Sequence, residues 1–327
     1  MLTFREMPTT MRALVIDKTG DADELYLTQV LTPTAIFDEV IVRVIAASVN
    51  PVDAKMRAGK GAASEIAAFP AILGLDFSGV VVTSPYPAFH LQPGDAVYGM
   101  TRFPRTSGSF AEYVAVTALS LARKPARLSH VEAAAVPLAA LTAWGMVVET
   151  AQASAGQRIL IHAGSGGVGH FAVQFAHAHG AHVTATGSAR NLDFLRELGA
   201  DEVFDYTAGR FEEELGGFDT VIDLIGNVVD STGTRSLAVL KPDGLLVNAP
   251  TGSWPTLDDD AAAAGVRATG FRVSSDRHTL EKISELLDAG LVRAHVDRVF
   301  DLAEGAAAHR QIEHGHTRGK IVLRVGE

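Results

Sequence analysis

Apolar residues follow two different patterns along the chain, and the change comes near residue 125. Before it, short β-branched runs are separated by turns rich in Gly, Pro and Asp, which is typical of β-strands. The strands expected in this stretch are residues 12–16, 40–47, 77–82, 96–99 and 110–116. We therefore expect a mainly β block with little helix.

From residue 129 onward, strands and helices are expected to alternate. Ser129 and Glu132 have the spacing of a capping box, which predicts a helix to about Thr150 that Pro137 bends or splits. The strands expected after this helix are residues 158–162, 182–186, 202–205, 220–224, 245–249 and 266–273, and the helices are 167–179, 190–198, 229–240 and 279–289. This alternation is typical of a parallel, doubly wound sheet.

The last part of the chain returns to short strands. Residues 296–300 and 320–325 are expected to be strands, with a helix over 303–313 between them. Such strands suit the N-terminal block better than the parallel sheet. The predicted fold class is therefore α/β, with a Rossmann-type doubly wound parallel sheet over 129–290 and a discontinuous, mainly β domain made of 1–128 and 291–327.

Composition narrows the classes of function. The chain has 327 residues, which is enough for two domains, and a net charge of −10. Such a charge would repel a nucleic-acid backbone, so we expect no nucleic-acid partner. There is no cysteine, which excludes disulfides and cysteine-ligated zinc. Neither a signal pattern nor an apolar run of 18 residues is visible, so we expect a cytoplasmic protein with no membrane partner.

The sequence ILIHAGSGGVG at residues 159–169 sets three glycines in the pattern GxGxxG after a β-branched run, and an apolar stretch of helical period follows. A strand, a glycine turn and a helix in this order predict a site where backbone N–H groups bind a nucleotide pyrophosphate. The predicted contacts in the turn are Gly164, Ser165, Gly166, Gly167, Val168 and Gly169. The alternative is a turn that packs a helix and binds nothing.

The end of the second strand of the parallel sheet indicates which nucleotide binds. Binders of NAD usually carry an acid there, which accepts hydrogen bonds from the ribose, but residues 186–190 read TGSAR. The hydroxyl of Ser188 and the guanidinium of Arg190 suit a 2′-phosphate. We therefore predict NADPH as the cofactor. Ser188 as a plain helix cap and Arg190 as a solvated side chain are the alternatives.

Eight stretches of the chain resemble the medium-chain dehydrogenase/reductase superfamily, in its zinc-independent quinone oxidoreductase branch. They are AASVNPVDAKMRAG (46–59), PAILGLDFSGVV (70–81), PGDAVYGM (93–100), GSFAEYVAV (108–116), AAAVPLAALTAWG (133–145), HAGSGGVGHFAVQFA (162–176), LGADEVFDY (198–206) and GKIVL (319–323). The resemblance implies a GroES-like β domain and a homodimer. The zinc alcohol dehydrogenases of the superfamily have a cysteine where this chain has Asn50, and they hold a structural zinc with four cysteines. The resemblance therefore implies no metal in this chain.

The resemblance also implies catalytic residues. Asn50 would lie near the nicotinamide and the substrate oxygen, and Asp53 would hold the shape of the same loop. Lys55 stands where many relatives have a tyrosine that faces the substrate, and Thr142 matches a threonine that contacts the nicotinamide half. The alternatives are a loop asparagine bonded to its own backbone, an exposed lysine, and a helix threonine bonded to a carbonyl.

Three further cofactor contacts follow from the resemblance. Tyr206 would lie by the 2′-phosphate, or it is a half-buried aromatic residue at a strand end. Asn248, at the carboxyl edge of the sheet, would contact the nicotinamide. Lys320 matches the C-terminal Gly-Lys near the cofactor, although packing explains it equally well. Many relatives have a basic residue at the position of Asn191, whereas the base here is Arg190.

These observations lead to one main hypothesis. The chain is expected to be a zinc-independent, NADPH-dependent reductase that transfers hydride to a quinone or an α,β-unsaturated carbonyl compound. A trans-acting enoyl-thioester reductase and a non-catalytic NADPH-binding sensor are the alternatives. The residue that supplies the proton is not identified by the sequence.

Overall fold

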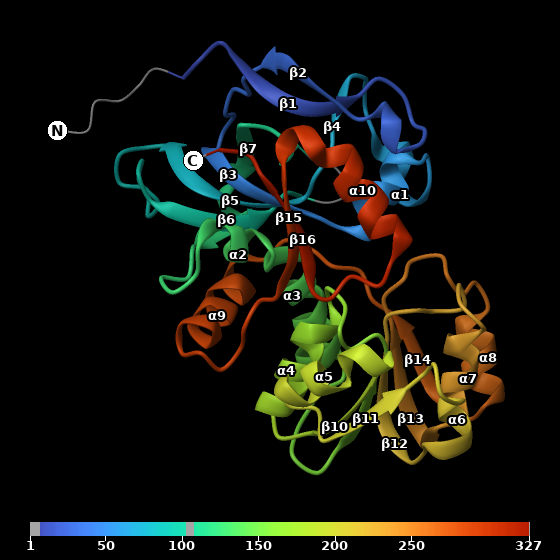
Figure 1. Cartoon of the computed structure of the whole chain (residues 1–327). Coiled ribbons are helices and arrows are strands. Elements are labelled where there is room, and N and C mark those ends of the chain that lie inside the picture. Colours follow the sequence, from blue (N-terminus) through green and yellow to red (C-terminus); the bar gives the residue numbers. More distant parts are fainter. Residues whose placement is uncertain (1–6, 103–107, 327) are drawn as a thin grey trace.

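The computed structural model describes residues 7–102 and 108–326. Figure 1 shows two parts, with the N-terminal strands and the tail in the upper part and the alternating strands and helices in the lower part. This arrangement confirms the predicted α/β class, with a parallel sheet and a mainly β domain. Over the described residues, no helix is both long and apolar enough to cross a membrane.

The lower part is built on a six-stranded parallel sheet in the order β11-β10-β9-β12-β13-β14. Its strands are β9 (Arg158–Ile161), β10 (His182–Gly187), β11 (Glu202–Asp205), β12 (Phe218–Asp223), β13 (Leu240–Asn248) and β14 (Arg267–Gly270). The connecting helices are α4 (Gly169–Ala178), α5 (Leu192–Glu197), α6 (Phe211–Glu214), α7 (Thr232–Leu237) and α8 (Leu257–Ala263). The strand order reverses between β9 and β12, and sheets of this kind bind ligands at the carboxyl ends of those strands.

The upper part contains a seven-stranded sheet in which N-terminal strands pair with two strands of the tail. The last strand runs antiparallel to β3, with Ile321 opposite Val49. The strands are β3 (Glu39–Val49), β5 (Asp76–Thr83), β6 (Ala96–Met100), β7 (Tyr113–Thr117), β8 (Leu121–Arg123), β15 (Val296–Asp301) and β16 (Lys320–Arg324). A smaller sheet joins β1 (Thr10–Ile16), β2 (Tyr26–Leu31) and β4 (Ala71–Ile72). The tail therefore completes the β domain.

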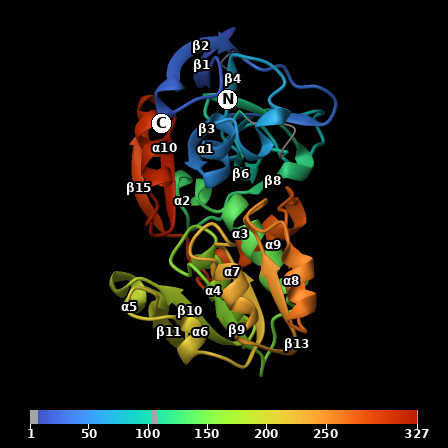
Figure 2. The ribbon, with the colours of Figure 1, turned by 90° about the vertical axis from the view of Figure 1, so that its right-hand side faces the viewer.

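Helices α2 (His130–Ala134), α3 (Pro137–Trp144) and α9 (Arg277–Asp288) lie between the two parts (Figure 2). The predicted capping box is present at Ser129, and Pro137 splits the predicted helix by starting α3, which ends in a π-helical turn. Helix α3 packs against α4 below and β6 above. Because Tyr98 of β6 and Phe171 of α4 belong to one buried cluster, the two parts share a hydrophobic core.

Two remaining helices border the upper part, α1 (Pro51–Arg57) and α10 (Gly305–His314), and they pack against each other. The predicted helix over 229–240 is shorter than expected. Asp230 and Ser231 have φ values of 46° and 48°, which are left-handed and incompatible with a helix start before them. Helix α7 therefore begins only at Thr232, and β13 starts already at Leu240.

Candidate functional site

The glycine turn joins the end of β9 to the start of α4 at the carboxyl edge of the parallel sheet. Gly166 donates its N–H to the carbonyl of Ala163 (2.9 Å), which itself has φ = 50°. A Cβ atom on Gly169 would lie 2.2 Å from the Ala163 carbonyl oxygen, and one on Gly164 would lie 2.9 Å from Leu195 Cδ2. Close packing against backbone atoms therefore requires glycine at position 169, whereas position 164 is crowded by side chains.

Gly166 has a different environment. A Cβ atom there would come within 4 Å of one described atom, the Ala163 carbonyl oxygen at 3.3 Å. Its Cβ position is therefore much less crowded than those of Gly164 and Gly169, and it lies beside the N-terminus of α4, a helix of ten residues. Backbone N–H groups and the positive end of a helix dipole suit a phosphate at such a place. The turn fits the pyrophosphate of a dinucleotide.

Asn191 ties the end of β10 to the glycine turn. Its buried side-chain amide donates to Ser165 Oγ (3.0 Å) and to Ser188 Oγ (3.3 Å). Its Oδ1 accepts a hydrogen bond from Arg318 Nε (2.9 Å), and a second nitrogen of Arg318 donates to the Arg190 carbonyl (2.8 Å). A guanidinium from the tail therefore stands at the position where many relatives, by the resemblance, have a basic side chain at 191.

The side chains of Arg190 and Arg318 both lie beyond the end of β10. Arg190 is exposed and donates to the carbonyl of His316 (2.7 Å). A cleft of about 560 Å³ beside them is lined by Arg190, Asn191, His295, Asp297, Gln311, His314, Gly315, His316 and Arg318. Among these lining residues Asp297 has the one carboxylate, so the cleft is cationic although the chain is acidic. The sequence missed Arg318, because no spacing rule joins residue 318 to the end of β10.

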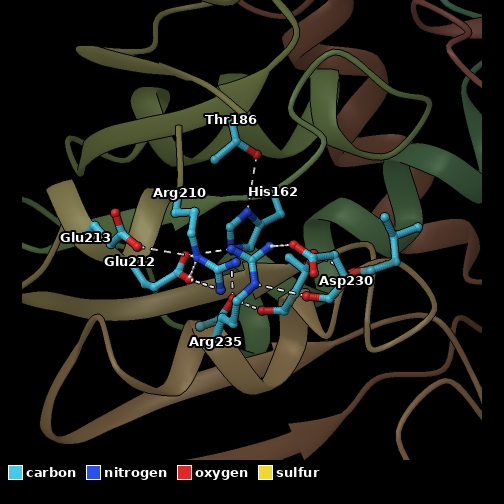
Figure 3. A network of polar contacts seen from close by, with 10 residues as sticks. His162, Thr186, Arg210, Glu212, Glu213, Asp230 and Arg235 are labelled. Carbon is cyan, nitrogen blue, oxygen red and sulfur yellow. Dashed lines mark hydrogen bonds and ion pairs between the residues drawn. The ribbon is translucent and has the colours of Figure 1, made fainter. Parts of the chain in front are cut away.

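His162 lies directly before the glycine turn and is buried. Its Nδ1 is 3.2 Å from Thr186 Oγ1 on β10 (Figure 3), and its Nε2 is 2.9 Å from Ser236 Oγ on α7. Burial lowers the pKa of His162 to about 4, so the ring is neutral near pH 7. It fixes the end of β9 against its neighbours. The signal that could have found it is a polar residue in an otherwise apolar strand.

A network of charged side chains surrounds this histidine (Figure 3). The Phe211 ring packs against His162, with 4.6 Å between centroids, and the Arg235 guanidinium lies over Phe211 at 4.8 Å. Arg235 pairs with Glu212 (2.6 Å) and with Asp230 (3.0 Å). These contacts hold the loop 226–231 at the carboxyl edge of the sheet.

A second polar cluster lies in the upper part, where the end of β3 meets the starts of β5 and β16. Its members Asn50, Asp76 and Lys320 are 1%, 0% and 3% exposed. Asn50 Nδ2 donates to Asp76 Oδ2 (2.9 Å), and Lys320 Nζ donates to Asn50 Oδ1 and lies 3.5 Å from Asp76 Oδ2. The N–H of Leu138, in the first turn of α3, donates to the other Asp76 oxygen (2.8 Å). The buried carboxylate is therefore well compensated.

Asp53 adds a second buried carboxyl group. It accepts the backbone N–H of Asn50 (2.8 Å) in a capping box that starts α1. Burial raises the pKa of Asp53 to about 7, against the hydrogen bonds from Asn50. Burial also raises the pKa of Asp76 and lowers that of Lys320, while the attraction between these two groups opposes both shifts. Each of the three groups is therefore easier to neutralise than in water.

Lys320 also contacts the glycine turn. The neighbouring Gly319 donates its N–H to the Ser165 carbonyl (2.8 Å). A Cβ atom on Gly167 would lie 3.1 Å from Lys320 Cδ, so the stem of the lysine runs along the turn while its Nζ reaches Asn50. Lys320 therefore links the turn that fits a pyrophosphate to the asparagine expected near the nicotinamide.

Two other predicted catalytic residues lie close to this cluster in the chain. Thr142 is buried, and its hydroxyl donates to the Leu138 carbonyl (2.7 Å), as expected for a helix threonine. Leu138 also binds Asp76, so Thr142 lies one helical turn from the cluster. Lys55 is exposed on α1. The structure thus joins Asn50 and Lys320 directly, and the roles of Thr142 and Lys55 stay predictions.

Asn248 and Tyr206 stand at the carboxyl edge of the parallel sheet. Asn248 Nδ2 donates to Asp223 Oδ2 (2.7 Å), and the other oxygen of Asp223 accepts the N–H of Gly226 (2.8 Å). Asn248 therefore shapes the turn after β12. Tyr206 is 47% exposed, and its N–H donates to the Gly187 carbonyl (3.2 Å) at the end of β10. Their contacts with a cofactor stay predictions.

A metal site would need several ligating side chains close together. In residues 7–102 and 108–326, no group of three or more His, Cys, Asp or Glu side chains is arranged to hold a metal ion. The full sequence contains no cysteine. The expectation of a metal-free enzyme therefore stays a prediction that chelation can test.

Comparisons with known proteins agree with this architecture. Residues 37–126 match the family model described as "Alcohol dehydrogenase GroES-like domain", and residues 198–323 match the one described as "Zinc-binding dehydrogenase". The name of the second model refers to zinc. This chain has no cysteine and so cannot bind zinc in the manner of the zinc alcohol dehydrogenases.

Individual relatives match over nearly the whole chain. "NAD(P)H oxidoreductase RTN4IP1, mitochondrial" of Danio rerio is 36% identical, over 98% of this chain and 92% of the relative. "NADPH-dependent alkenal/one oxidoreductase, chloroplastic" of Arabidopsis thaliana is 35% identical, over 97% and 80%. The solved structure of the quinone oxidoreductase from Coxiella burnetii is 35% identical, with a TM-score of 0.91 over 97% of this chain and 99% of that one.

Proposed function

Because the chain belongs to the medium-chain dehydrogenase/reductase superfamily, in its zinc-independent quinone oxidoreductase branch, we propose that it reduces quinones or α,β-unsaturated carbonyl compounds with NADPH. One observation carries the proposal. The glycine turn and the buried cluster of Asn50, Asp76 and Lys320 are joined by the Lys320 side chain, which passes Gly167 and reaches Asn50. A dinucleotide on the turn would thus have its reactive end beside a polar, water-poor cluster.

The turn and the end of β10 have separate tasks in this proposal. The turn at residues 164–169 binds the pyrophosphate through the backbone N–H groups of Ser165, Gly167 and Val168, since those of Gly164 and Gly166 are bonded to carbonyls of the protein. Arg190 and Arg318 bind the 2′-phosphate, with Ser188 and Tyr206 beside them. A doubly charged 2′-phosphate accepts charge-assisted hydrogen bonds from both guanidinium groups. NADH has no 2′-phosphate and cannot form these bonds. This arrangement explains a preference for NADPH.

The bound cofactor supplies a hydride, and the protein supplies orientation and a polar environment. Asn50 and Thr142 line the nicotinamide end in the proposal, and Lys55 faces the substrate. Asn248 holds the turn after β12, which borders the same edge. Since a conjugated carbonyl or a quinone is already electrophilic, a metal ion is not required for the transfer.

The proposal is tested by following NADPH oxidation with a panel of quinones, enones and enoyl thioesters, with NADH as the control cofactor. Turnover of quinones or enones with NADPH is expected. Turnover of enoyl thioesters alone would favour an acyl reductase of the same chemistry. Saturable NADPH binding without turnover of any acceptor would indicate a sensor, and the absence of binding would contradict the proposal entirely.

The proposal extends to assembly, domain limits and location. We place the dinucleotide-binding domain at 129–290 and the catalytic domain at 1–128 with 291–327, in a cytoplasmic homodimer. The exposed strand β14 at the edge of the parallel sheet offers hydrogen-bonding groups to a second copy. Sedimentation equilibrium of the full chain tests the dimer, and limited proteolysis followed by mass spectrometry tests the domain limits.

A further inference from the structure

Reduction of a conjugated carbonyl or a quinone leaves negative charge on an oxygen of the acceptor, and a cation or a proton donor must meet it. In zinc dehydrogenases the metal has that task. Here, resting on the proposed function, we propose that the Lys320 ammonium is the group that gives a proton to the oxygen of the acceptor. Asn50 and Asp76 hold it in place as positioning residues.

Burial and position single out this lysine. Among residues 7–102 and 108–326, Lys320 is the one lysine that is buried. Its Nζ donates to Asn50 Oδ1 and lies 3.5 Å from Asp76 Oδ2. An ammonium has three N–H donors, and these two contacts engage two of them; in the proposal the third meets the acceptor oxygen.

All hydrogen-bonding groups of the Asn50 side-chain amide are engaged within the protein. Its Oδ1 accepts from Lys320, and its Nδ2 donates to Asp76 Oδ2 (2.9 Å) and more weakly to the Ser48 carbonyl (3.4 Å). An amide with both hydrogens and its oxygen engaged is a poor donor to a substrate. Asn50 therefore acts through Lys320, whose ammonium it orients.

The proposed step transfers one proton from Lys320 to the reduced acceptor. After hydride has formed a new C–H bond on the acceptor, an electron pair rests on the acceptor oxygen. Lys320 gives one proton from Nζ to this oxygen, so that an N–H bond breaks and an O–H bond forms. The neutral amine stays beside Asn50 and Asp76 until water returns a proton to it. The acceptor has then gained one hydride and one proton.

The surroundings favour this transfer in both directions. Burial lowers the pKa of Lys320, so the ammonium releases its proton more readily than an exposed lysine does. The carboxyl groups of Asp76 and Asp53 oppose that shift and favour the return of the proton. A donor with a pKa closer to the working pH is the more effective one.

The first test compares Lys320→Met with Lys320→Arg. The methionine keeps an unbranched stem along Gly167 but has no proton, and the arginine keeps the charge but does not release a proton. We expect kcat to fall roughly 10²- to 10⁴-fold in both variants, as is typical for loss of a general acid. The alkaline limb of the kcat profile should disappear. Lys124→Met, which removes an ammonium bonded to the Pro125 carbonyl (2.9 Å) outside this cluster, is the matched control.

The second test needs no turnover. The probe is 4-nitrophenol, whose ionised form absorbs visible light, added to the protein with NADP⁺. Wild type should bind the phenolate and lower the pH at which the bound phenol ionises. Lys320→Arg should retain this shift because it keeps the charge, and Lys320→Met should lose it. The two variants thus separate charge from proton transfer.

Other outcomes overturn the inference. If Lys320→Met raises the Kd of NADPH but leaves kcat, its pH profile and the phenol ionisation unchanged, Lys320 is a cofactor contact or a packing residue. If Lys55→Met instead removes the alkaline limb, the donor is the exposed lysine of α1. Thermal melts of each variant identify a folding defect. If Lys320→Met fails to fold, the kcat of Lys320→Arg tests the proton transfer. Failure of wild type with every acceptor would refute the proposed function, whereas the phenol measurement still tests Lys320.

Discussion

The glycine turn and the cluster of Asn50, Asp76 and Lys320 are two halves of one site, and they are built by different means. The turn uses a run of eleven adjacent residues, 159–169, and its shape depends on where a Cβ atom is absent. The cluster joins side chains of which two, Asn50 and Lys320, lie 270 positions apart. The turn depends on space beside the backbone and the cluster on compensated buried charge. Substitutions in the two halves should therefore have different effects on stability and on NADPH binding.

Removal of a charge from the cluster should have the largest effect on stability. In Asp76→Ala, the Lys320 ammonium and the Leu138 N–H lose their buried acceptor. Breaking a buried ion pair from one side costs about 3–5 kcal/mol, so the free energy of unfolding in urea should fall by that amount. The control is Asp193→Ala, whose carboxylate is 93% exposed in a surface pair with Arg196 and should change stability by less than about 1 kcal/mol. Equal stability of the two variants would contradict the comparison.

A larger side chain in the turn should affect stability at Gly169 and cofactor binding at Gly166. Gly169→Val places Cβ against the Ala163 carbonyl and should cost about 3 kcal/mol of stability. Gly166→Val brings Cβ to 3.3 Å from the same carbonyl oxygen, a much milder contact, so it should fold with a smaller loss of stability than Gly169→Val while NADPH binding is abolished. Thermal melts and NADPH fluorescence titrations of the two variants measure both effects. Undiminished NADPH affinity in Gly166→Val would show that the turn does not bind the pyrophosphate.

The same contrast explains what the sequence could predict. The turn and the alternation of strands and helices are local, so periodicity and spacing predicted β9, α4 and the parallel sheet. The tail was assigned to the β domain because its strands are short. Strand β2 was missed because its side chains are mostly exposed, which leaves little alternation to read. The bond between Arg318 and Asn191 was missed because it exists only once the tail folds back over the turn.

Arg318 offers the next test, since it brings a tail residue to the local half of the site. Arg318→Ala should weaken NADPH binding by about 1.5–3 kcal/mol, the range for a hydrogen bond to a charged group. NADH has no 2′-phosphate, so its affinity should hardly change, and Arg190→Ala should act in the same direction. The exposed Arg196→Ala is the control. An equal loss for both cofactors would mean that Arg318 only supports Asn191.

The stability of the protein should depend on pH through Asp53, which lies beside the cluster and not in the turn. Burial raises the pKa of Asp53 from 3.8 to about 7, so the native state holds this proton more tightly than the unfolded state. Its contribution to stability is present below pH 4 and is lost as pH rises to 7, by at most about 1.4 kcal/mol per pH unit. Asp53→Asn should remove this fall from urea titrations between pH 4 and 7, and Asp193→Asn should not. Parallel curves for wild type and Asp53→Asn would show that Asp53 is ionised in the folded protein.

The smallest effect is expected from removal of metal ions. The chain has no cysteine to hold zinc as the zinc dehydrogenases do, and the cation beside Asn50 is the ammonium of Lys320. Charge stabilisation in this site therefore comes from a side chain, which dialysis does not remove. NADPH oxidation should be unchanged after dialysis against EDTA, with a zinc alcohol dehydrogenase treated in parallel as the positive control. A loss of activity that zinc restores would place a metal ion where we place the lysine, and it would make the two halves of the site depend on a third component.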